Sequence, residues 1–267
     1  MEGCEVVFHC AALTDLNSPW EQFEDIIVEG TRRVLQAAVE CNIQRVVNVS
    51  SEAALVTGFG YPLVDVDDIV DHLPDPDTQI GLNYPRAKNL AERVCQSFAS
   101  QIHVVTVRPR FIWGAGDTVV MKHLVEQAKS LTGFAWIGGA EFMTSTANIS
   151  NVIHGILLAS EKGVSGHSYF LTDEEDLTLK EMFTKLFSTQ RIDSSSFPSL
   201  PILLAKALAW TGLIPDVNAT SMALLAQQVT VKCPKAKEDL GYSPIVSMDQ
   251  GMEELRVGFD MKKLGNH

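Results

Sequence analysis

The sequence predicts an α/β fold in which helices cover both faces of a parallel sheet, with a smaller lobe at the C-terminal end. Three short apolar runs, over 5–12, 46–49 and 104–107, are typical of strands buried on both faces. Each run is separated from the next by a segment with apolar residues at helical spacing. This strand–helix–strand–helix–strand order requires right-handed crossovers between parallel strands.

The two helices of this unit follow from the spacing of their apolar residues. The first is predicted over 20–42, where apolar residues recur at helical intervals: Phe23, Ile26, Ile27, Val34, Leu35 and Ala38. The second begins near Tyr84 and continues through Leu90, Ala91, Val94 and Phe98. Each helix connects two strands, as a parallel sheet requires.

Small or polar residues follow each predicted strand where it ends. The three strand ends carry Ala11-Ala12, Ser50-Ser51 and Arg108-Pro109. In open α/β sheets, ligands bind at the carboxyl ends of the strands. We therefore expect the chemistry of this protein at these three places.

The second half of the chain contains helix starts with recognisable caps. A helix is predicted over 149–161, with Asn148 or Ser150 as its cap. Segments 178–181 and 247–250 fit capping boxes, and each precedes a predicted helix.

The length of 267 residues suits one large domain or two small ones. The composition shifts gradually near residues 114–116, which we take as a boundary. We expect a sheet domain over 1–115 and a C-terminal lobe over 116–267, with the two interleaved.

The longest apolar stretch, over 199–215, is interrupted by Lys206 and is too short for a membrane span. It predicts a buried or interfacial helix. Core packing is one interpretation, and a wall for a flat apolar ligand or a contact with a membrane surface are the other two.

Charge and cysteine content exclude several classes of protein. The chain has 21 Lys and Arg against 33 Asp and Glu, a formal net charge of −12, whereas nucleic acids and anionic membranes attract clustered basic residues. Six aspartates within 65–77 predict a solvated acidic loop. Five cysteines without a CxxC pair favour reduced thiols in the cytoplasm over a disulfide framework. The histidines lack ligand spacing, so no metal site is expected.

Tyr84 and Lys88 form the pair that most clearly points to acid/base chemistry. Pro85 is tolerated only in a first helical turn, so Tyr84 is predicted at a helix start, with Lys88 one turn later on the same face. A free tyrosine has a pKa of about 10. A nearby ammonium and the positive end of a helix should both lower the pKa of Tyr84 and make it an acid/base group. A hydroxyl from Ser50 or Ser51 could bind the same reacting oxygen.

A solvated Tyr–Lys helix face is the competing interpretation, and a Ser-Ser pair after a strand often only caps or turns the chain. The order of the whole set favours the chemical interpretation. An apolar strand with Ala-Ala, a strand with Ser-Ser, the Tyr–Lys helix and a strand with Arg-Pro follow one another in the sequence.

This set resembles the extended short-chain dehydrogenase/reductase family, and within it the 3β-hydroxysteroid dehydrogenase and sterol-dehydrogenase branch. The resemblance extends from the start of the chain to about residue 245. The matching segments are 7–12, 30–31, 49–51, 84–88, 108–114 and 240–244. It implies a Rossmann-like sheet, a substrate-binding C-terminal lobe and an NAD or NADP cofactor.

The resemblance also implies residue roles. Tyr84 is the expected general acid/base, and Lys88 is expected to lower its pKa and to hold the nicotinamide ribose. Ser51 is expected to orient the substrate oxygen, with Ser50 as the alternative. The remaining cofactor contacts implied are Ala11, Ala12, Pro109 and Ile112.

The sequence departs from the family pattern in two places. No GxxGxxG or GxGxxG occurs, so the first strand corresponds to the family's fourth, and the first βαβαβ half with its pyrophosphate turn is expected to be missing. We hypothesise a truncated product in which Val6–Phe8 forms an open apolar sheet edge. The family's usual Asn before the Gly-Thr pair is replaced by Ile27.

Three functions follow as hypotheses. The first is an NAD(P)-dependent oxidoreductase that oxidises a secondary alcohol, with a small apolar alcohol or ketone such as a sterol as its substrate. The second is a catalytically inactive binding or dimerising fragment, and the third is a nucleotide-sugar epimerase or dehydratase. A homodimer, a contact with a membrane surface and a cytoplasmic location at the endoplasmic reticulum are compatible with the first.

Overall fold

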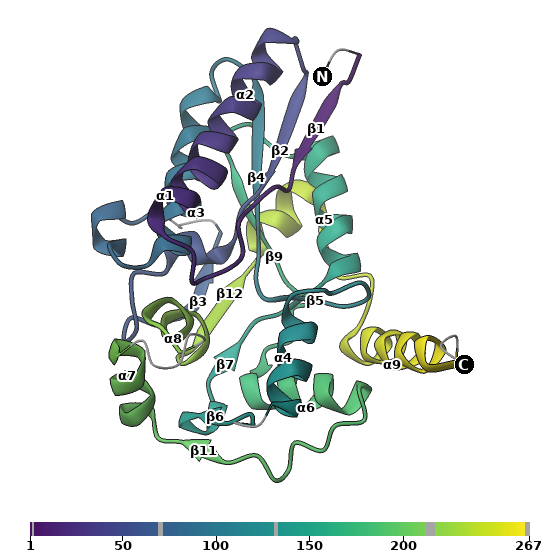
Figure 1. Cartoon of the computed structure of the whole chain (residues 1–267). Helices are drawn as coiled ribbons and strands as arrows, with labels where there is room; N and C mark the ends of the chain where they lie inside the picture. The colour runs from purple at the N-terminus through teal and green to yellow at the C-terminus, as the bar shows by residue number, and fades with distance from the viewer. Residues whose placement is uncertain (2, 69–71, 131–132, 212–216, 265–267) are drawn as a thin grey trace.

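The computed structural model describes residues 1, 3–68, 72–130, 133–211 and 217–264. Its main sheet has the strand order β1-β2-β4-β9, and every pair in it is parallel (Figure 1). The four strands are β1 (Val6–His9), β2 (Arg45–Val49), β4 (His103–Pro109) and β9 (Ser168–Leu171). The predicted parallel sheet is therefore confirmed.

Helices cover both faces of this sheet, because alternate strand residues point to opposite sides. Val46 and Val104 pack against the helices on one face, and Val47 and Val105 pack against the helix on the other. Figure 1 shows this arrangement. The first face is covered by α2 (Gly30–Glu40) and α3 (Asn83–Phe98), and the second by α5 (Ile149–Lys162).

The single helix predicted over 20–42 is built from three segments. They are α1 (Trp20–Phe23), a π-helical stretch η1 (Glu24–Glu29) and α2. Phe23, Ile27, Leu35 and Ala38 are buried, as their spacing predicts. A π-helical turn contains more residues than an α-helical turn. The side chains after η1 therefore point in a direction that is rotated from the one a continuous α-helix would give them.

Strand β1 lies at the edge of the main sheet. Within the described residues it pairs with β2 alone, and the side chain of Phe8 on it is 43% exposed. An apolar edge strand of this kind offers unpaired backbone groups to another strand.

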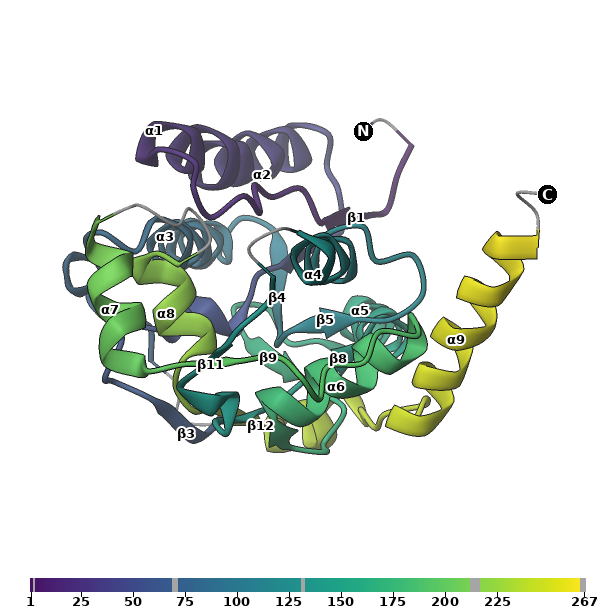
Figure 2. The same ribbon diagram turned by 60° about the horizontal axis from the view of Figure 1, so that its bottom comes forward.

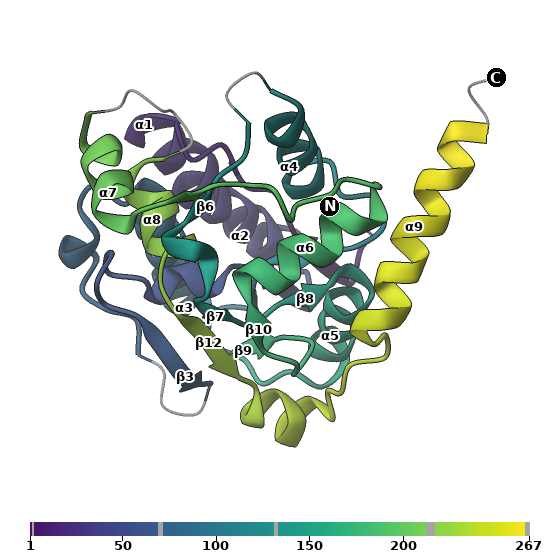
Figure 3. The same cartoon turned by 90° about the horizontal axis from the view of Figure 1, so that it is seen from below.

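The lower part of the molecule contains a second sheet with the order β10-β7-β12-β3, whose strands are labelled in Figure 3. The chain also forms two strand pairs, β5–β8 and β6–β11. The strands of the second sheet are β10 (Leu177–Thr178), β7 (Met143–Thr144), β12 (Val229–Lys232) and β3 (Leu63–Asp67). The pairs are β5 (Ile112–Trp113) with β8 (Ala147–Asn148), and β6 (Trp136–Ile137) with β11 (Ser199–Leu200).

Five further helices belong to this part of the chain. Figures 2 and 3 show α7 and α8 side by side and α9 projecting from the body. The helices are α4 (Val120–Lys129), α6 (Leu179–Thr189), α7 (Ile202–Thr211), α8 (Ala219–Leu225) and α9 (Met248–Leu264). Shorter turns are η2 (Glu52–Leu55), η3 (Pro76–Gln79), η4 (Gly138–Ala140) and η5 (Ala236–Leu240).

The chain crosses between the two parts more than once. Strand β9 and helix α5 come from the second half of the sequence but complete the main sheet, whereas β3 comes from the first half and pairs with β12. The boundary near residue 115 stays a prediction, and the lobes 1–115 and 116–267 exchange strands across it.

The predicted helix caps are confirmed. Asn148 accepts a hydrogen bond from the Ser150 backbone and caps α5. Thr178 and Glu181 form the capping box of α6. Ser247 and Gln250 bond each other in the same reciprocal way at the start of α9.

The prediction of a solvated acidic loop over 65–77 is wrong for its first part. Asp65 and Asp67 lie in β3, and Asp68 is fully buried. The Asp68 carboxylate accepts hydrogen bonds from three backbone N–H groups, those of Phe170, Lys235 and Ala236. These bonds offset the cost of burying it. Residues 69–71 of the stretch lie outside the described residues.

The apolar stretch over 199–215 forms β11 and α7. Ala205 is fully buried, but Leu203 is 80% exposed and Leu204 is 49% exposed, so core packing accounts for one side of the helix only. Residues 212–216 lie outside the described residues. Among the helices described, none has both the length and the apolar character needed to cross a membrane.

Candidate active site

The predicted site residues gather at the carboxyl edge of the main sheet. Ala11 and Ala12 follow β1, Ser51 follows β2, and Pro109 is the last residue of β4. Because the three strands are parallel, their carboxyl ends meet at one edge. Ala12 packs against the core under α2 and α3, whereas Ala11 is exposed. Ile112 lies in β5 just beyond this edge and is partly exposed.

Tyr84 is the second residue of α3, as Pro85 at the next position predicts. Its ring is half-buried and meets the Phe23 ring edge-on, with 6.3 Å between centroids. It also packs against Leu82 and Ala53. The rigid apolar contacts on both sides fix the ring at the end of the sheet.

Lys88 lies one helical turn after Tyr84 and is almost fully buried, with 5% of its surface exposed. Its Nζ lies 5.9 Å from the centroid of the Tyr84 ring and donates a hydrogen bond to the Val49 carbonyl oxygen at 3.0 Å. Burial lowers the pKa of Lys88 to about 8, and the nearby carboxylate of Glu92 opposes the change. The ammonium is therefore close to titrating near neutral pH.

The two serines after β2 face different surroundings. The Ser51 hydroxyl donates to Glu52 Oε2 at 2.6 Å, accepts from the Ala53 N–H at 3.2 Å and lies close enough to the Tyr84 phenol to lower its pKa. Ser50 is buried and donates to Glu92 instead. The geometry therefore brings Ser51, and not Ser50, to Tyr84.

The expected lowering of the pKa of Tyr84 is wrong for the chain as it stands. Burial of the phenol raises its pKa above the ordinary 10, the carboxylate of Glu52 raises it further, and the bond from Ser51 offsets only part of this. Lys88, whose Nζ lies 5.9 Å from the ring centroid, does not offset this rise in the pKa of Tyr84. The free phenol is protonated at neutral pH.

The profile of the 3-beta hydroxysteroid dehydrogenase/isomerase family matches residues 1–202. The chain belongs to this family. The expected NAD(P)-dependent oxidoreductase class is confirmed at the level of the family.

Two relatives illustrate the range of the family. A protein of Stigmatella aurantiaca named 4-hydroxy-2-methyl-3-oxo-4-farnesyl-3,4-dihydroquinoline-1-oxide ketoreductase is 39% identical, over 96% of this chain and 78% of that protein. The sterol-4-alpha-carboxylate 3-dehydrogenase, decarboxylating, of Dictyostelium discoideum is 27% identical, over 96% of this chain and 81% of that protein.

Solved structures show the same fold. A dTDP-glucose 4,6-dehydratase from Streptomyces venezuelae, solved with NAD and DAU bound, superposes with a TM-score of 0.75 at 18% identity. The match covers 98% of this chain and 75% of that one. The Rossmann-like fold expected from the resemblance is therefore confirmed.

The family position usually held by Asn is part of the core in this chain. Ile27 is 2% exposed, and its carbonyl oxygen accepts a hydrogen bond from the Thr31 hydroxyl at 2.7 Å. His9 Nε2 lies 3.0 Å from the same hydroxyl oxygen. Since the Thr31 proton is used on Ile27, His9 is the donor in that contact. His9 is thus a buried residue whose Nε2 has a hydrogen-bond partner.

Sequence reasoning missed two buried ion pairs at this edge. Arg110 Nη1 lies 2.7 Å from Glu52 Oε1, and Arg108 Nη2 lies 2.6 Å from Glu92 Oε2. Glu92 follows Lys88 by four residues on the same helix face, a spacing that could have revealed it. No spacing connects Glu52 with Arg110, which are 58 positions apart.

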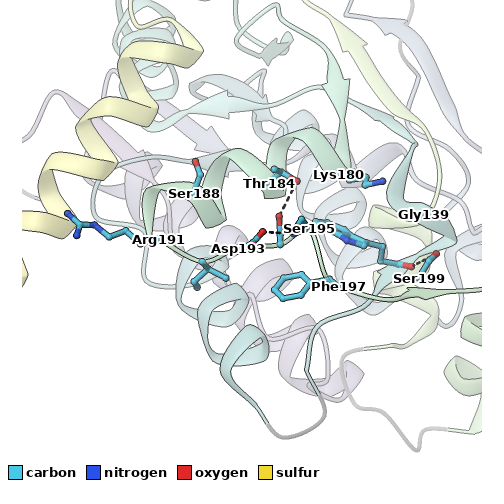
Figure 4. A pocket seen from close by; sticks show the side chains of 12 residues that line it. Gly139, Lys180, Thr184, Ser188, Arg191, Asp193, Ser195, Phe197 and Ser199 are labelled. Carbon is cyan, nitrogen blue, oxygen red and sulfur yellow. Dashed lines mark hydrogen bonds between the residues drawn. The ribbon is translucent and has the colours of Figure 1, made fainter.

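A hollow of about 720 Å³ in the lower lobe lies apart from these residues (Figure 4). Its basic side chains are already paired, Lys180 with Glu141 and Arg191 with Asp260. None of the predicted site residues lines it. Among the described parts of the chain, no cluster of three or more His, Cys, Asp or Glu could hold a metal ion.

The residues at the sheet edge fit one end of a nicotinamide dinucleotide. Within the described residues, Lys88 Nζ makes its hydrogen bond to Val49, and an ammonium has three donors. Two N–H groups remain for ribose hydroxyls beside Tyr84. The Gly-rich turn that would hold the pyrophosphate does not occur in the sequence. The fit therefore concerns the nicotinamide-ribose end of the cofactor.

Proposed function

We propose that this chain interconverts a secondary alcohol and the corresponding ketone with NAD or NADP as cofactor. The observation that carries the proposal is the meeting of Tyr84, Lys88 and Ser51 at the carboxyl edge of the main sheet. This arrangement supplies a proton donor or acceptor, a buried cation and an oxygen-binding hydroxyl within one turn of α3 and the end of β2.

Each residue has one task in this proposal. Tyr84 exchanges a proton with the reacting oxygen, and Ser51 holds that oxygen beside the phenol. Lys88 binds the ribose through its remaining N–H groups. The nicotinamide, when bound, supplies or accepts the hydride. Because the free phenol is protonated at neutral pH, Tyr84 is ready to donate to a ketone, whereas alcohol oxidation needs the phenolate and is favoured at higher pH.

We infer that the substrate is a flat, apolar alcohol or ketone, such as a sterol with a 3-hydroxyl group. The names of the two relatives support this inference, since one is a sterol dehydrogenase and the other reduces a farnesylated quinoline ketone. Exposed leucines on α7 offer an apolar surface on the C-terminal lobe.

The test begins with calorimetric titration of the folded chain with NAD and NADP, followed by assays with 3β-hydroxysteroids and the matching ketones. Tyr84→Phe should abolish turnover with little change in stability. Tyr61→Phe is the matched control, because Tyr61 is 69% exposed and lies outside the site. Full turnover in the Tyr84→Phe variant would refute the proposal.

The remaining outcomes separate the alternatives. Absence of cofactor binding up to millimolar concentration would identify an inactive fragment. Turnover of a nucleotide sugar, without turnover of steroids, would identify an epimerase or dehydratase. Sedimentation of the same samples would decide whether the expected homodimer forms.

We also propose that α7 contacts a membrane surface from the cytoplasm. Leu203 and Leu204 are both exposed, on a helix whose other side is anchored by buried Ala205. Co-flotation with neutral phosphatidylcholine vesicles should be lost in Leu203→Glu and kept in Leu157→Glu, a control on an exposed leucine of α5. Equal flotation of both variants would contradict the proposal.

A further inference from the structure

Leu225, the last residue of α8, is a half-buried leucine between the proposed site and the lower lobe. Helix α8 lies next to α3, which carries Tyr84 (Figure 2). Leu225 packs against the apolar cluster on which the Tyr84 ring also packs, and whose buried members include Ala53 and Leu82. It packs as well against the cluster of the lower lobe that contains Phe183 of α6. Within the described residues, Leu225 is the only side chain that belongs to both clusters.

Arg110 fixes the end of α8 beside the carboxyl edge of the main sheet. Its Nη2 donates to the Leu224 carbonyl oxygen at 2.8 Å, and its Nη1 lies 2.7 Å from Glu52 Oε1. Both Arg110 and Glu52 are buried, so this connection is shielded from water. Glu52 directly follows Ser51 in the sequence. Leu225 directly follows Leu224, so the connection ties the backbone at Leu225 to the segment that carries Ser51.

Phe111 follows Arg110 and has a backbone conformation that few aromatic residues adopt. Its φ is +43°, in the left-handed region where a bulky side chain is strained. Among the described residues other than glycine that have a positive φ, Phe111 is the only aromatic one. Its half-buried ring packs on the Phe183 ring, with 5.7 Å between centroids. Backbone strain of this kind concentrates at binding and active sites, and here it brings an aromatic ring from the end of β4 onto α6.

The contacts of Tyr84 indicate where the body of a substrate lies when its oxygen is at the phenol. On one side the Tyr84 ring meets Phe23, which is fully buried and belongs to the core under α2 and α3. On the other side, the cluster at α8 includes Leu225, which is only half-buried. A substrate body therefore gains apolar contact on the α8 side, where Leu225 and Phe111 both retain exposed surface.

We propose that Leu225, together with Phe111, is a specificity-determining residue that binds the apolar ring system of the substrate while the reacting oxygen is at Tyr84. The inference rests on the proposed function and adds the residues that select a large, flat alcohol or ketone over a small one. Apolar rings that cover the exposed surface of Leu225 and Phe111 remove it from water, which favours binding in proportion to the area covered. A single-ring alcohol covers less of this surface than a steroid does, so the two should respond differently to a change at Leu225.

The kinetic test compares kcat/KM for a 3β-hydroxysteroid and for cyclohexanol, with the full chain and NAD or NADP. Leu225→Ala shortens the side chain and should lower kcat/KM about tenfold for the steroid, with less than about a twofold change for cyclohexanol. Leu225→Met conserves the volume and should keep the steroid value within about threefold of the wild type. Equal losses for both substrates in Leu225→Ala, or no loss for the steroid, would overturn the inference.

Leu158→Ala is the matched control for this comparison. Leu158 is also a half-buried leucine on a helix, but it packs against the cluster between α5 and the other face of the main sheet. Its replacement should leave the ratio of the two kcat/KM values unchanged. A change of that ratio as large as the one in Leu225→Ala would also overturn the inference.

A second readout needs no turnover. Titration of the full chain with a 3-ketosteroid, followed by tryptophan fluorescence, should give a dissociation constant that rises about tenfold in Leu225→Ala and stays unchanged in Leu158→Ala. Leu225→Gln keeps the size of the side chain but not its apolar character, and it should weaken binding to a similar degree if Leu225→Ala does not fold. Absence of steroid binding to the wild type, or equal binding by all variants, would overturn the inference.

The two experiments separate this inference from the proposed function. Steroid binding that depends on Leu225, without oxidation of any alcohol by the wild type, would refute the proposed function and leave the contact at Leu225 in place. Turnover of both alcohols that does not change in Leu225→Ala would support the proposed function and overturn the inference.

Discussion

Replacing Lys88 by Met should make the protein more stable while removing the ribose contact proposed for it. Lys88 is 5% exposed, and within the described residues its ammonium has a hydrogen bond to Val49 but no direct ion pair. Methionine has a similar length and carries no charge, so it should occupy the same space.

The size of the effect follows from the pKa of Lys88, which falls from the ordinary 10.5 to about 8 in the folded chain. At about 1.4 kcal/mol for each tenfold change in proton affinity, holding the charge costs about 3 kcal/mol below pH 8. Loss of the hydrogen bond to Val49 costs about 1 kcal/mol. A net gain of about 2 kcal/mol is expected for Lys88→Met at neutral pH.

The dependence on pH gives the sharper test. Between the folded value near 8 and the unfolded value of 10.5, the unfolded chain binds more protons at Lys88 than the folded chain does. The free energy of unfolding of the wild-type protein should therefore rise with pH in this window, relative to the variant, by up to about 3 kcal/mol. Urea unfolding of both proteins, followed by tryptophan fluorescence from about pH 7 to about pH 10, measures it. A difference that stays constant over this range would refute the reasoning.

Three other changes test the fold. Phe8→Lys, on the exposed edge strand, should slow aggregation in light scattering and shift Tm by only a few degrees, and equal aggregation would contradict the role of that edge. Asp68→Asn should lower the free energy of unfolding in urea by about 2 kcal/mol, because the amide cannot accept from all three N–H groups. An unchanged urea midpoint would contradict this prediction. Gly155→Ala should lower the free energy of unfolding by about 2 kcal/mol, since the new Cβ would lie 2.5 Å from the Leu171 side chain. Gly258→Ala is the control, and it should raise the free energy of unfolding by about 0.5 kcal/mol because the space around Gly258 is open. Equal stability of the two alanine variants would refute this.

The arrangement of α3 could be predicted from the sequence because its determinants are local. Pro85 fixes the first turn of α3, and the spacing of Tyr84 and Lys88 places them on one face. The strands followed in the same way from continuous apolar runs, and the caps of α5, α6 and α9 from short motifs.

The electrostatics of the site could not be predicted, because they depend on contacts between distant parts of the chain. The rise in the pKa of Tyr84 requires the burial of its ring and the placement of Glu52, which Arg110 holds from 58 positions away. The choice between Ser50 and Ser51 likewise depends on which of them faces Glu92. The burial of Asp68 could not be predicted for the same reason, since its hydrogen-bond donors lie more than 100 positions later in the chain.

The exchange of strands between the two lobes has a consequence for how the protein is made. Strand β3 cannot form its backbone hydrogen bonds until β12 has been synthesised, because Leu63 pairs with Val229 in that strand. In the same way, the second edge of β4 stays open until β9 has been synthesised. During synthesis the N-terminal half therefore leaves the ribosome with strand edges that stay unpaired until β9 and β12 have followed. Such a topology folds slowly, because long loops must close before their contacts form. A nascent chain of this kind exposes unpaired strand edges for longer than a protein whose lobes are each complete in sequence.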